Sequence, residues 1–464
     1  MVRHLITIDD LSEAEILAIF NQADDYLATM THPDRPWRIR GGRSDASQFQ
    51  LATLFYEAST RTRFSFESAM GRLGGQVLSS ADPKTTSAAK GETLADTIRV
   101  VENYADVVVI RHPNEGAARV LADFAEIPII NAGDGGHEHP TQTLCDLYTL
   151  RREKGSLKNL NVALWGDLKH GRTAHSLAYG LARFGAKILS MAAPGFELPE
   201  HVLQRLEQDY GCVPVSSSEI DRLRRDDLAV DAAYIAPAKP HQRTLFTNPL
   251  ATSTGETTAH DLAAQAARPA RIDALYVTRL QRERMTTGDG TGSYDTINAE
   301  FLRDRLDPSS SVMHPLPRVE ELSQEIDSDA RAVYFKQAAY GVPVRMALLA
   351  AVLGVKPGIL APEEPVSKYP LYTGRNVHCE NARCICGHEA ERRYLQPRFR
   401  MLFKHQQVVL RCTYCDHELT PAWIGHLSTQ TCTPNSHLPQ PPAADSLVFP
   451  DEAAARAASF TPQT

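Results

Sequence analysis

A short run of hydroxyl and guanidinium side chains occupies residues 57–63, which read EASTRTR. The run follows the apolar stretch LATLF and opens a helix-like segment, so Ser59, Thr60, Arg61 and Thr62 would lie at a helix N-terminus. Free backbone N–H groups at such an end bind anions, hydroxyls add donors, and an arginine adds a charged planar fork. The run therefore predicts a phosphate site, with an ordinary capped helix and solvated arginines as the alternative.

The segments that must position this run alternate between β-rich strands and helices. Strands are predicted at 51–55, 105–111, 127–133, 161–167, 186–194, 230–237 and 272–279, and helices from residue 59 and at 115–126, 139–155 and 175–185. This βαβ order predicts an α/β fold with two doubly wound parallel-sheet domains that are joined by the helix ending at Gly155. A cleft between the two domains would hold the site.

Composition sets the broad class of protein. The chain has 464 residues, 42% hydrophobic content and a net charge of -7, which suit a soluble globular protein of two or three domains. No apolar stretch is long enough to cross a bilayer and no signal-peptide pattern opens the chain, so a cytoplasmic location is expected. Six of the eight cysteines lie between residues 379 and 432, which favours a metal site in a reducing compartment.

Composition shifts along the chain predict the domain boundaries. The expected units are a first domain at 1–150, a second domain at 151–355 with an insertion at 236–271, a proline-rich linker at 356–370, a cysteine module at 371–432 and a disordered tail at 433–464. The last apolar helix of the second domain is expected to pack back on the first domain.

Longer motifs extend the chemistry beyond residues 57–63. They read FYEASTRTRFSFESAMGRLGG, TSAAKGETLADT, NAGDGGHEHPTQTLCDLYTL, GDLKHGRTAHSL, VTRLQRER and MHPLPRVEEL. Together they resemble the aspartate and ornithine carbamoyltransferases over nearly all of residues 1–355. The resemblance implies a carbamoyltransferase that needs no catalytic metal or organic cofactor and works as a homotrimer with active sites shared between subunits.

The resemblance also implies a set of residues for carbamoyl phosphate. These would be Ser59, Thr60, Arg61, Thr62, Arg111, His139 and Gln142. The chemistry agrees, because a dianionic phosphate needs cations and a helix N-terminus, and a carbonyl oxygen that gains charge needs donors.

Two further features of the resemblance concern neighbouring subunits and domain closure. Lys90 resembles a lysine that the family lends to the adjacent active site, and either Thr86 or Ser87 would supply a hydroxyl beside it. Glu57 and Arg284 resemble residues that hold the domains closed, with local ion pairs as the alternative.

The second substrate is predicted from the remaining motifs. The aspartate-binding candidates are Lys90, Arg172, Arg279, Gln281 and the carbonyl of Leu316. Arginines suit a dicarboxylate and repel the cationic side chain of ornithine, so aspartate is favoured, which implies an early step of pyrimidine biosynthesis. The alternatives are transfer to another amine, for which the insertion could reshape the pocket, and an inactive homologue whose cysteine module serves as an adaptor.

The cysteine module predicts a structural zinc site. Cys379, Cys384, Cys412 and Cys415 form a C-x4-C-x27-C-x2-C pattern, which suits tetrahedral thiolate zinc. Cys386 is interpreted as a spare thiol. The module resembles the zinc domain of the regulatory chain that accompanies some aspartate carbamoyltransferases, but no segment remains for that chain's nucleotide-binding domain. Docking on the acidic catalytic part is favoured over contact with nucleic acid.

Overall fold

The computed structural model describes most of the chain. Described are residues 2–463 except 170, 193–194, 217–229, 237–271, 279–295, 362–368, 374–376, 389–390, 392–393, 437 and 444–445. The predicted insertion at 236–271 thus lies almost wholly outside the described residues.

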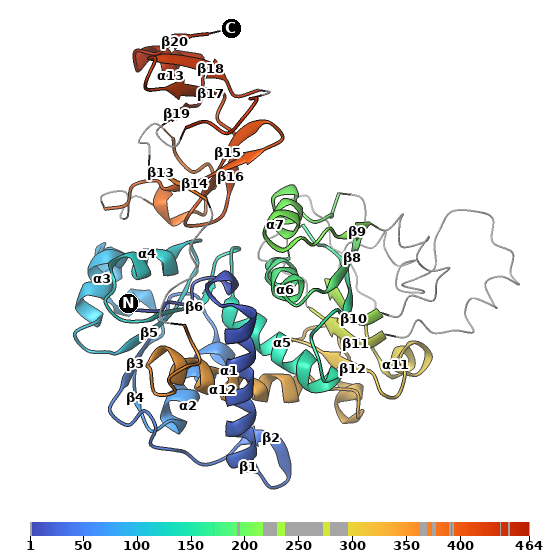
Figure 1. The fold of residues 1–464 in the computed structure, drawn as a ribbon. Coiled ribbons are helices and arrows are strands. Elements are labelled where there is room, and N and C mark those ends of the chain that lie inside the picture. Colours follow the sequence, from blue (N-terminus) through green and yellow to red (C-terminus); the bar gives the residue numbers. More distant parts are fainter. Residues whose placement is uncertain are drawn as a thin grey trace, which may run out of the picture.

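The first domain is built on a four-stranded parallel sheet (Figure 1). Its strands, in spatial order, are β4 (Gln76–Ser80), β3 (Gln50–Phe55), β5 (Val107–His112) and β6 (Ile129–Asp134). Its helices are α1 (Glu13–Thr29), α2 (Thr60–Arg72), α3 (Leu94–Val101) and α4 (Ala117–Phe124), and a hairpin is formed by β1 (Thr31–His32) and β2 (Arg35–Ile39).

Alternating side chains give this sheet two buried faces. Leu51 and Val109 pack in the core that includes residues of α1 and α2, whereas Ala52 and Val108 pack in the core that includes residues of α3 and α4. Because both faces are covered, the central strands β3 and β5 are apolar along most of their length, as expected of a parallel sheet.

The second domain carries a six-stranded sheet in which every pairing is parallel. Its order is β12 (Ser311–Met313), β11 (Ile272–Val277), β10 (Val230–Ala236), β7 (Asn161–Gly166), β8 (Lys187–Ala192) and β9 (Val215–Ser216). The described helices around it are α6 (Arg172–Arg183), α7 (Glu200–Tyr210) and α11 (Ala299–Arg305).

Two long helices connect these domains. Helix α5 (Pro140–Lys154) leads from the first domain to the second and ends at Gly155, which adopts the left-handed conformation. Helix α12 (Tyr334–Val352) returns the chain and packs against α1, α2 and α5. The site between the domains is therefore supported by helices that belong to both.

The C-terminal part contains two small sheets, drawn in orange and red in Figure 1. The first comprises β13 (Leu371–Tyr372), β14 (Phe399–Lys404), β15 (Gln407–Cys412) and β16 (Glu418–Leu419), all antiparallel. The second has the order β19 (Leu447–Phe449), β17 (Trp423–His426), β18 (Thr431–Pro434) and β20 (Thr461–Pro462), with helix α13 (Glu452–Ala457) beside it.

The second small sheet corrects the expectation of a disordered tail at 433–464. Cys432, Phe449, Ala455 and Phe460 form a small buried core there. The proline-rich composition of the tail concealed this core, because its apolar residues lie on strands too short to give a periodic signal.

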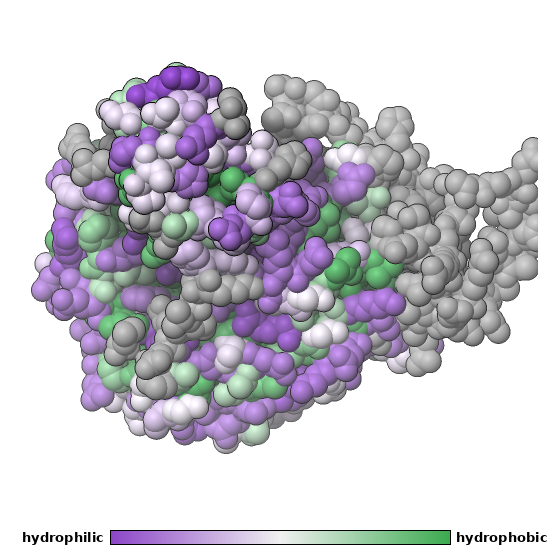
Figure 2. Space-filling view, turned by 45° about the horizontal axis from the view of Figure 1, so that its top comes forward, coloured by the Kyte–Doolittle hydropathy of each residue, from purple (hydrophilic) through white to green (hydrophobic). Residues whose placement is uncertain are grey.

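Among the described residues, no helix is long and apolar enough to cross a bilayer. Figure 2 shows one face of the molecule, on which hydrophilic residues predominate and hydrophobic residues lie in small, scattered groups.

Candidate active site

Helix α2 presents its N-terminus to a cavity between the domains. Ser59 is its N-cap residue in extended conformation, yet its side chain makes no capping hydrogen bond, so the hydroxyl is not used within the helix. No acidic residue lies in the first turn, which leaves the helix dipole free to attract an anion. The other arginine of this run, Arg63, pairs instead with Glu67 at 3.6 Å on the helix surface.

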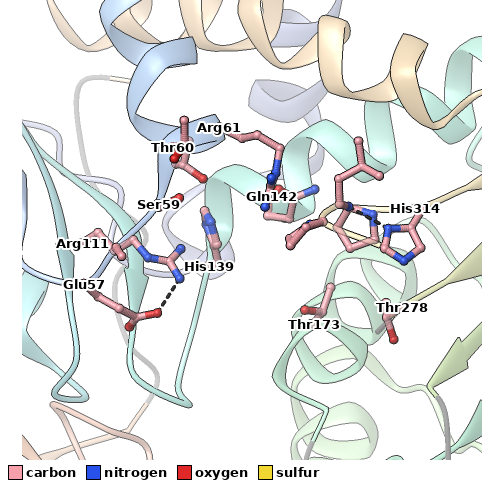
Figure 3. A pocket seen from close by; sticks show the side chains of 15 residues that line it. Glu57, Ser59, Thr60, Arg61, Arg111, His139, Gln142, Thr173, Thr278 and His314 are labelled. Atoms are coloured by element: carbon pink, nitrogen blue, oxygen red, sulfur yellow. Dashed lines mark hydrogen bonds and ion pairs between the residues drawn. The ribbon is translucent and has the colours of Figure 1, made fainter. Parts of the chain in front are cut away.

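Arg111 projects from the end of β5 into the same cavity (Figure 3). Its Nη2 donates to Glu57 Oε1 at 2.5 Å and its Nη1 donates to the carbonyl of Ala132 at 3.2 Å. Glu57 therefore forms a local ion pair within the first domain. A Cβ at Gly133, where φ is +116°, would lie 3.1 Å from Arg111 Nη1 and 3.4 Å from His139 Cδ2, so glycine permits this close approach.

The start of α5 supplies two more polar side chains. His139 is the N-cap residue of this helix, and Gln142 lies one turn on, so both line the cavity. Gln142 Nε2 donates to Asp146 Oδ1 at 2.8 Å. Asp146 also accepts hydrogen bonds from Gln337 and Tyr276 at 2.9 Å each, and burial raises its pKa to about 7.

Sequence reasoning missed Asp146. Its spacing of four residues from Gln142 on a predicted helix was the one available signal, because residues so spaced lie on the same helix face. The hydrogen bonds that Gln337 and Tyr276 donate to Asp146 join segments far apart in the sequence, so a local sequence pattern does not predict them.

The opposite wall of the cavity is the loop after β12. His314 Nδ1 accepts a hydrogen bond from the backbone N–H of Leu316 at 2.8 Å, and its Nε2 lies 2.8 Å from Glu321 Oε1. Both ring nitrogens are thus engaged, and burial lowers the pKa of His314. This histidine holds the loop in shape and is not available as a general base.

Together these elements enclose a cavity of about 490 Å³. It is lined by Glu57, Ala58, Ser59, Thr60, Arg61, Thr62, Arg111, His139, Gln142, Thr173, Thr278, His314, Pro315, Leu316 and Pro317. The structure thus brings together every residue predicted to bind carbamoyl phosphate. Figure 3 shows Arg111 and His139 facing Thr173, Thr278 and His314 across the open space.

The other predicted site residues are placed less completely. Arg172 begins α6, next to the cavity-lining Thr173, but its side chain is not described, and Arg279, Gln281 and Arg284 lie outside the described residues. Lys90 is exposed and does not line the cavity of its own chain.

The loop before Lys90 bears on the choice of hydroxyl donor. The Thr86 hydroxyl donates to the carbonyl of Pro83 at 2.8 Å and caps the next turn, whereas Ser87 is exposed. The Thr86 hydroxyl is thus engaged within its own loop.

A cysteine cluster lies where β15 ends. The sulfurs of Cys379, Cys384, Cys386 and Cys412 all lie within 4.8 Å of one another, and Cys415 Sγ lies 3.5 Å from Cys379 Sγ. The cysteines are unbridged. Tetrahedral zinc with Zn–S bonds of about 2.3 Å requires sulfurs about 3.8 Å apart, so this donor set fits a zinc ion.

Cys386 lies beside these cysteines. Its sulfur lies 3.2 Å from that of Cys384, closer than the 3.8 Å between Cys384 and Cys412. The short 3-10 helix Ile385–Gly387 carries Cys386 into the cluster, and its interpretation as a thiol that does not bind the metal stays a prediction.

The C-terminal module docks on both domains of its own chain. Asn381 donates to Glu115 of the first domain at 2.6 Å, and a Cβ on Gly116, where φ is +86°, would collide with Tyr414 at 2.5 Å. Lys404 donates to Gln204 of α7 in the second domain at 2.6 Å. The module therefore spans the junction between the two domains.

Fold and site together define an enzyme that binds an anionic substrate at a helix N-terminus between two doubly wound domains. Residues 3–152 match the carbamoyl-phosphate-binding domain of aspartate/ornithine carbamoyltransferase, and residues 227–352 match its Asp/Orn-binding domain. The chain belongs to the aspartate/ornithine carbamoyltransferase family. Residues 373–424 match the metal-binding domain of the aspartate carbamoyltransferase regulatory chain, which makes this segment a metal-binding module.

Several known proteins are similar to this chain over most of its length. The aspartate carbamoyltransferase catalytic subunits of Thermoplasma volcanium and Archaeoglobus fulgidus are each 41% identical over 76% of this chain, which covers 98% and 100% of their lengths. The solved catalytic subunit from M. jannaschii is 37% identical, with a TM-score of 0.55 over 77% of this chain and 99% of that one. The Trypanosoma cruzi aspartate transcarbamoylase in complex with carbamoyl phosphate is 32% identical, with a TM-score of 0.57 over 75% and 95%.

Proposed function

We propose that this chain transfers the carbamoyl group of carbamoyl phosphate to the amine of L-aspartate, giving N-carbamoyl-L-aspartate and phosphate. The observation that carries the proposal is the cavity itself, where the N-terminus of α2, Arg111 and His139 converge opposite the Leu316 loop. Crystal structures of the Trypanosoma cruzi aspartate transcarbamoylase with carbamoyl phosphate and aspartate support it, at 33% identity.

The phosphate would lie at the N-terminus of α2. Backbone N–H groups and the hydroxyls of Ser59, Thr60 and Thr62 donate to its oxygens, and Arg61 neutralises its charge. The carbamoyl carbonyl points toward Thr62, Arg111 and His139, with Gln142 beside it. Because Asp146 accepts one amide hydrogen of Gln142, the orientation of this amide is fixed and its oxygen is directed away from Asp146.

Aspartate would enter from the second domain. Arg172, Arg279 and Gln281 bind its carboxylates, with Lys90 from the neighbouring subunit, and the Leu316 carbonyl accepts a hydrogen bond from its amine. The neutral amine attacks the carbonyl carbon and forms a C–N bond, and the oxyanion of the tetrahedral intermediate is held by Thr62, Arg111 and His139. The C–O bond to phosphate then breaks, and the leaving phosphate takes the amine proton. His314 is held within its loop and is not available as a general base. We therefore assign the rate enhancement to positioning of the substrates and to electrostatic stabilisation of the oxyanion.

The assembly proposed for this reaction is a homotrimer with shared active sites. It is motivated by the exposed position of Lys90, away from the cavity of its own chain. Zinc is the proposed metal of the cysteine cluster, where it would hold the module together and take no part in catalysis.

The decisive experiment measures phosphate release from carbamoyl phosphate with L-aspartate and with L-ornithine in parallel. Release with aspartate alone, lowered at least 100-fold in Arg61→Ala, is expected, because a charge-assisted phosphate contact is removed. Arg63→Ala is the matched control, since Arg63 lies two residues on and pairs with Glu67 on the helix surface. Release with ornithine but not aspartate, or with neither amine, contradicts the proposal.

A further inference from the structure

A buried cluster of charged side chains lies where the two domains and the metal-binding module meet. It surrounds a second cavity of about 220 Å³, whose lining includes His137 and Glu138 of the first domain, Tyr179 and Arg205 of the second, and Asp416 of the module. The carbamoyl-transfer chemistry described above uses none of these residues.

His137 is held between two carboxylates. Its Nδ1 lies 3.0 Å from Asp134 Oδ2, and its Nε2 lies 3.2 Å from Asp416 Oδ2. An ionised carboxylate only accepts, so this arrangement favours a His137 ring that carries a hydrogen on each nitrogen. Burial alone would lower the pKa of His137, but Asp134 and Asp416 raise it well above its usual value.

Asp416 is itself held from two sides. Arg205 Nη1 of helix α7 donates to Asp416 Oδ2 at 2.9 Å, and the Arg205 guanidinium stacks 4.1 Å from the centre of the Tyr179 ring. The backbone N–H of Asp416 donates to the carbonyl of Cys412 at 3.0 Å, within the cysteine loop. The metal-binding loop thus fixes the carboxylate that meets His137.

Glu138, the residue after His137, is also held by hydrogen bonds. Glu138 is 1% exposed, its backbone N–H donates to Asp134 Oδ1 at 3.1 Å, and its Oε2 accepts from the Ser176 hydroxyl of α6 at 3.1 Å. The next residue along the chain is His139, which lines the carbamoyl phosphate cavity. A displacement of His137 would reach His139 through two peptide units.

We propose that Asp416 is a positioning residue for the active site: by binding His137 and Arg205 together, the metal-binding module fixes the backbone that places His139 against the reacting carbonyl. The inference rests on the proposed function, since it assigns His139 to the carbamoyl oxygen. It predicts that loss of this contact lowers kcat of the same chain more than it raises the KM for carbamoyl phosphate.

Asp416→Asn tests this in the full chain, because asparagine keeps the shape and removes the charge. We expect kcat, expressed per site titrated with N-(phosphonacetyl)-L-aspartate, to fall about tenfold, while the KM for carbamoyl phosphate changes less than twofold. In a His139→Ala background the same change should lower kcat less than twofold, because the residue through which it acts is gone. Glu380→Gln, at an exposed carboxylate beside Cys379, is the matched control.

A second measurement does not depend on activity. In ¹³C-histidine-labelled protein with full metal content, the His139 resonance, assigned from a His139→Asn variant, should move in Asp416→Asn and stay in place in Glu380→Gln. An unmoved resonance, an unchanged kcat per site, or an equal loss with and without His139 overturns the inference. If the wild-type protein shows no aspartate-dependent phosphate release, the proposed function is wrong. The His139 resonance would still test whether Asp416 positions His139.

Discussion

Arg111 and His139 come from different elements and meet beside Gly133. We expect Gly133→Ala to lower kcat/KM at least tenfold, because the new Cβ would press on both side chains and φ of +116° strains any residue with a Cβ. Steady-state rates with carbamoyl phosphate and aspartate measure the effect.

Gly211→Ala is the control for this substitution. Gly211 also has positive φ, +65°, but open space surrounds its Cβ position. This variant should lose about 1 kcal/mol of stability from the strain and keep its activity. Equal rates in both alanine variants would mean that the approach of Arg111 and His139 does not depend on Gly133.

Asp146 gives a prediction about pH. Burial raises its pKa from 3.8 to about 7, so the folded protein keeps a proton that the unfolded chain releases at lower pH. Its contribution to stability is therefore present at low pH and is lost as pH rises through about 7, with a slope of up to about 1.4 kcal/mol per pH unit. In Asp146→Asn the fall in melting temperature between pH 5 and pH 7 should shrink.

The control for this pH effect is Asp25→Asn, at an exposed position. Calorimetry of the three proteins over the same pH series makes the comparison. If Asp146→Asn and the wild-type protein show parallel curves, Asp146 does not titrate in this range.

How far the sequence predicts the site depends on how local each contact is. Ser59, His139 and Gln142 were found because each lies in a compact motif at the start of a helix. Asp416 was not found, because its contact with His137 joins residues 279 positions apart. An aspartate that follows a cysteine pair does not by itself indicate which residue it will contact.

The cysteine module shows at the scale of elements how ligands depend on local turns. Strand β15 ends at Cys412, and the loop that follows carries Cys415, while Cys386 sits in the 3-10 helix Ile385–Gly387. We expect Cys412→Ser to lose the metal and Cys386→Ser to retain one zinc per chain, because the latter leaves two cysteine pairs on separate knuckles.

Elemental analysis of the purified variants measures this difference. Cys212→Ser, in the second domain and remote in sequence from the cluster, is the control for handling losses. Loss of zinc from Cys386→Ser as complete as from Cys412→Ser would make Cys386 a ligand.

Elements with strong patterns were predicted well. The predicted strands at 51–55 and 105–111 correspond to β3 and β5, and the helix predicted to end at Gly155 is α5. Strand β4 was missed, because QVLSS is short and mostly polar and follows α2 after only Leu73, Gly74 and Gly75. Its place at the sheet edge comes from pairing with β3, which a local pattern does not encode.

At the scale of the whole molecule, the position of Lys90 leads to a prediction about subunits. Lys90→Ala and Arg61→Ala should each be nearly inactive alone. After the two are mixed under conditions that exchange subunits, activity should return, because some sites then combine an intact Arg61 with an intact neighbouring Lys90. In a random mixture, up to about one quarter of sites carry both intact residues, and that fraction of wild-type activity is the expected ceiling.

Mixing Arg61→Ala with Arg111→Ala provides the control for complementation. Both residues line the same cavity of one chain, so no shared site is repaired by exchange. Recovery in this control equal to that with Lys90→Ala would contradict site sharing.

The fusion of the metal-binding module to the catalytic domains has a consequence for subunit ratio and for dilution. Because the module follows α12 in the same chain, the module and its docking surface are made as one polypeptide in equal numbers. Docking is then intramolecular, so its extent should stay constant as the protein is diluted, whereas a separately encoded chain would dissociate. In this protein, each newly made catalytic chain carries its own metal-binding module from the moment of synthesis.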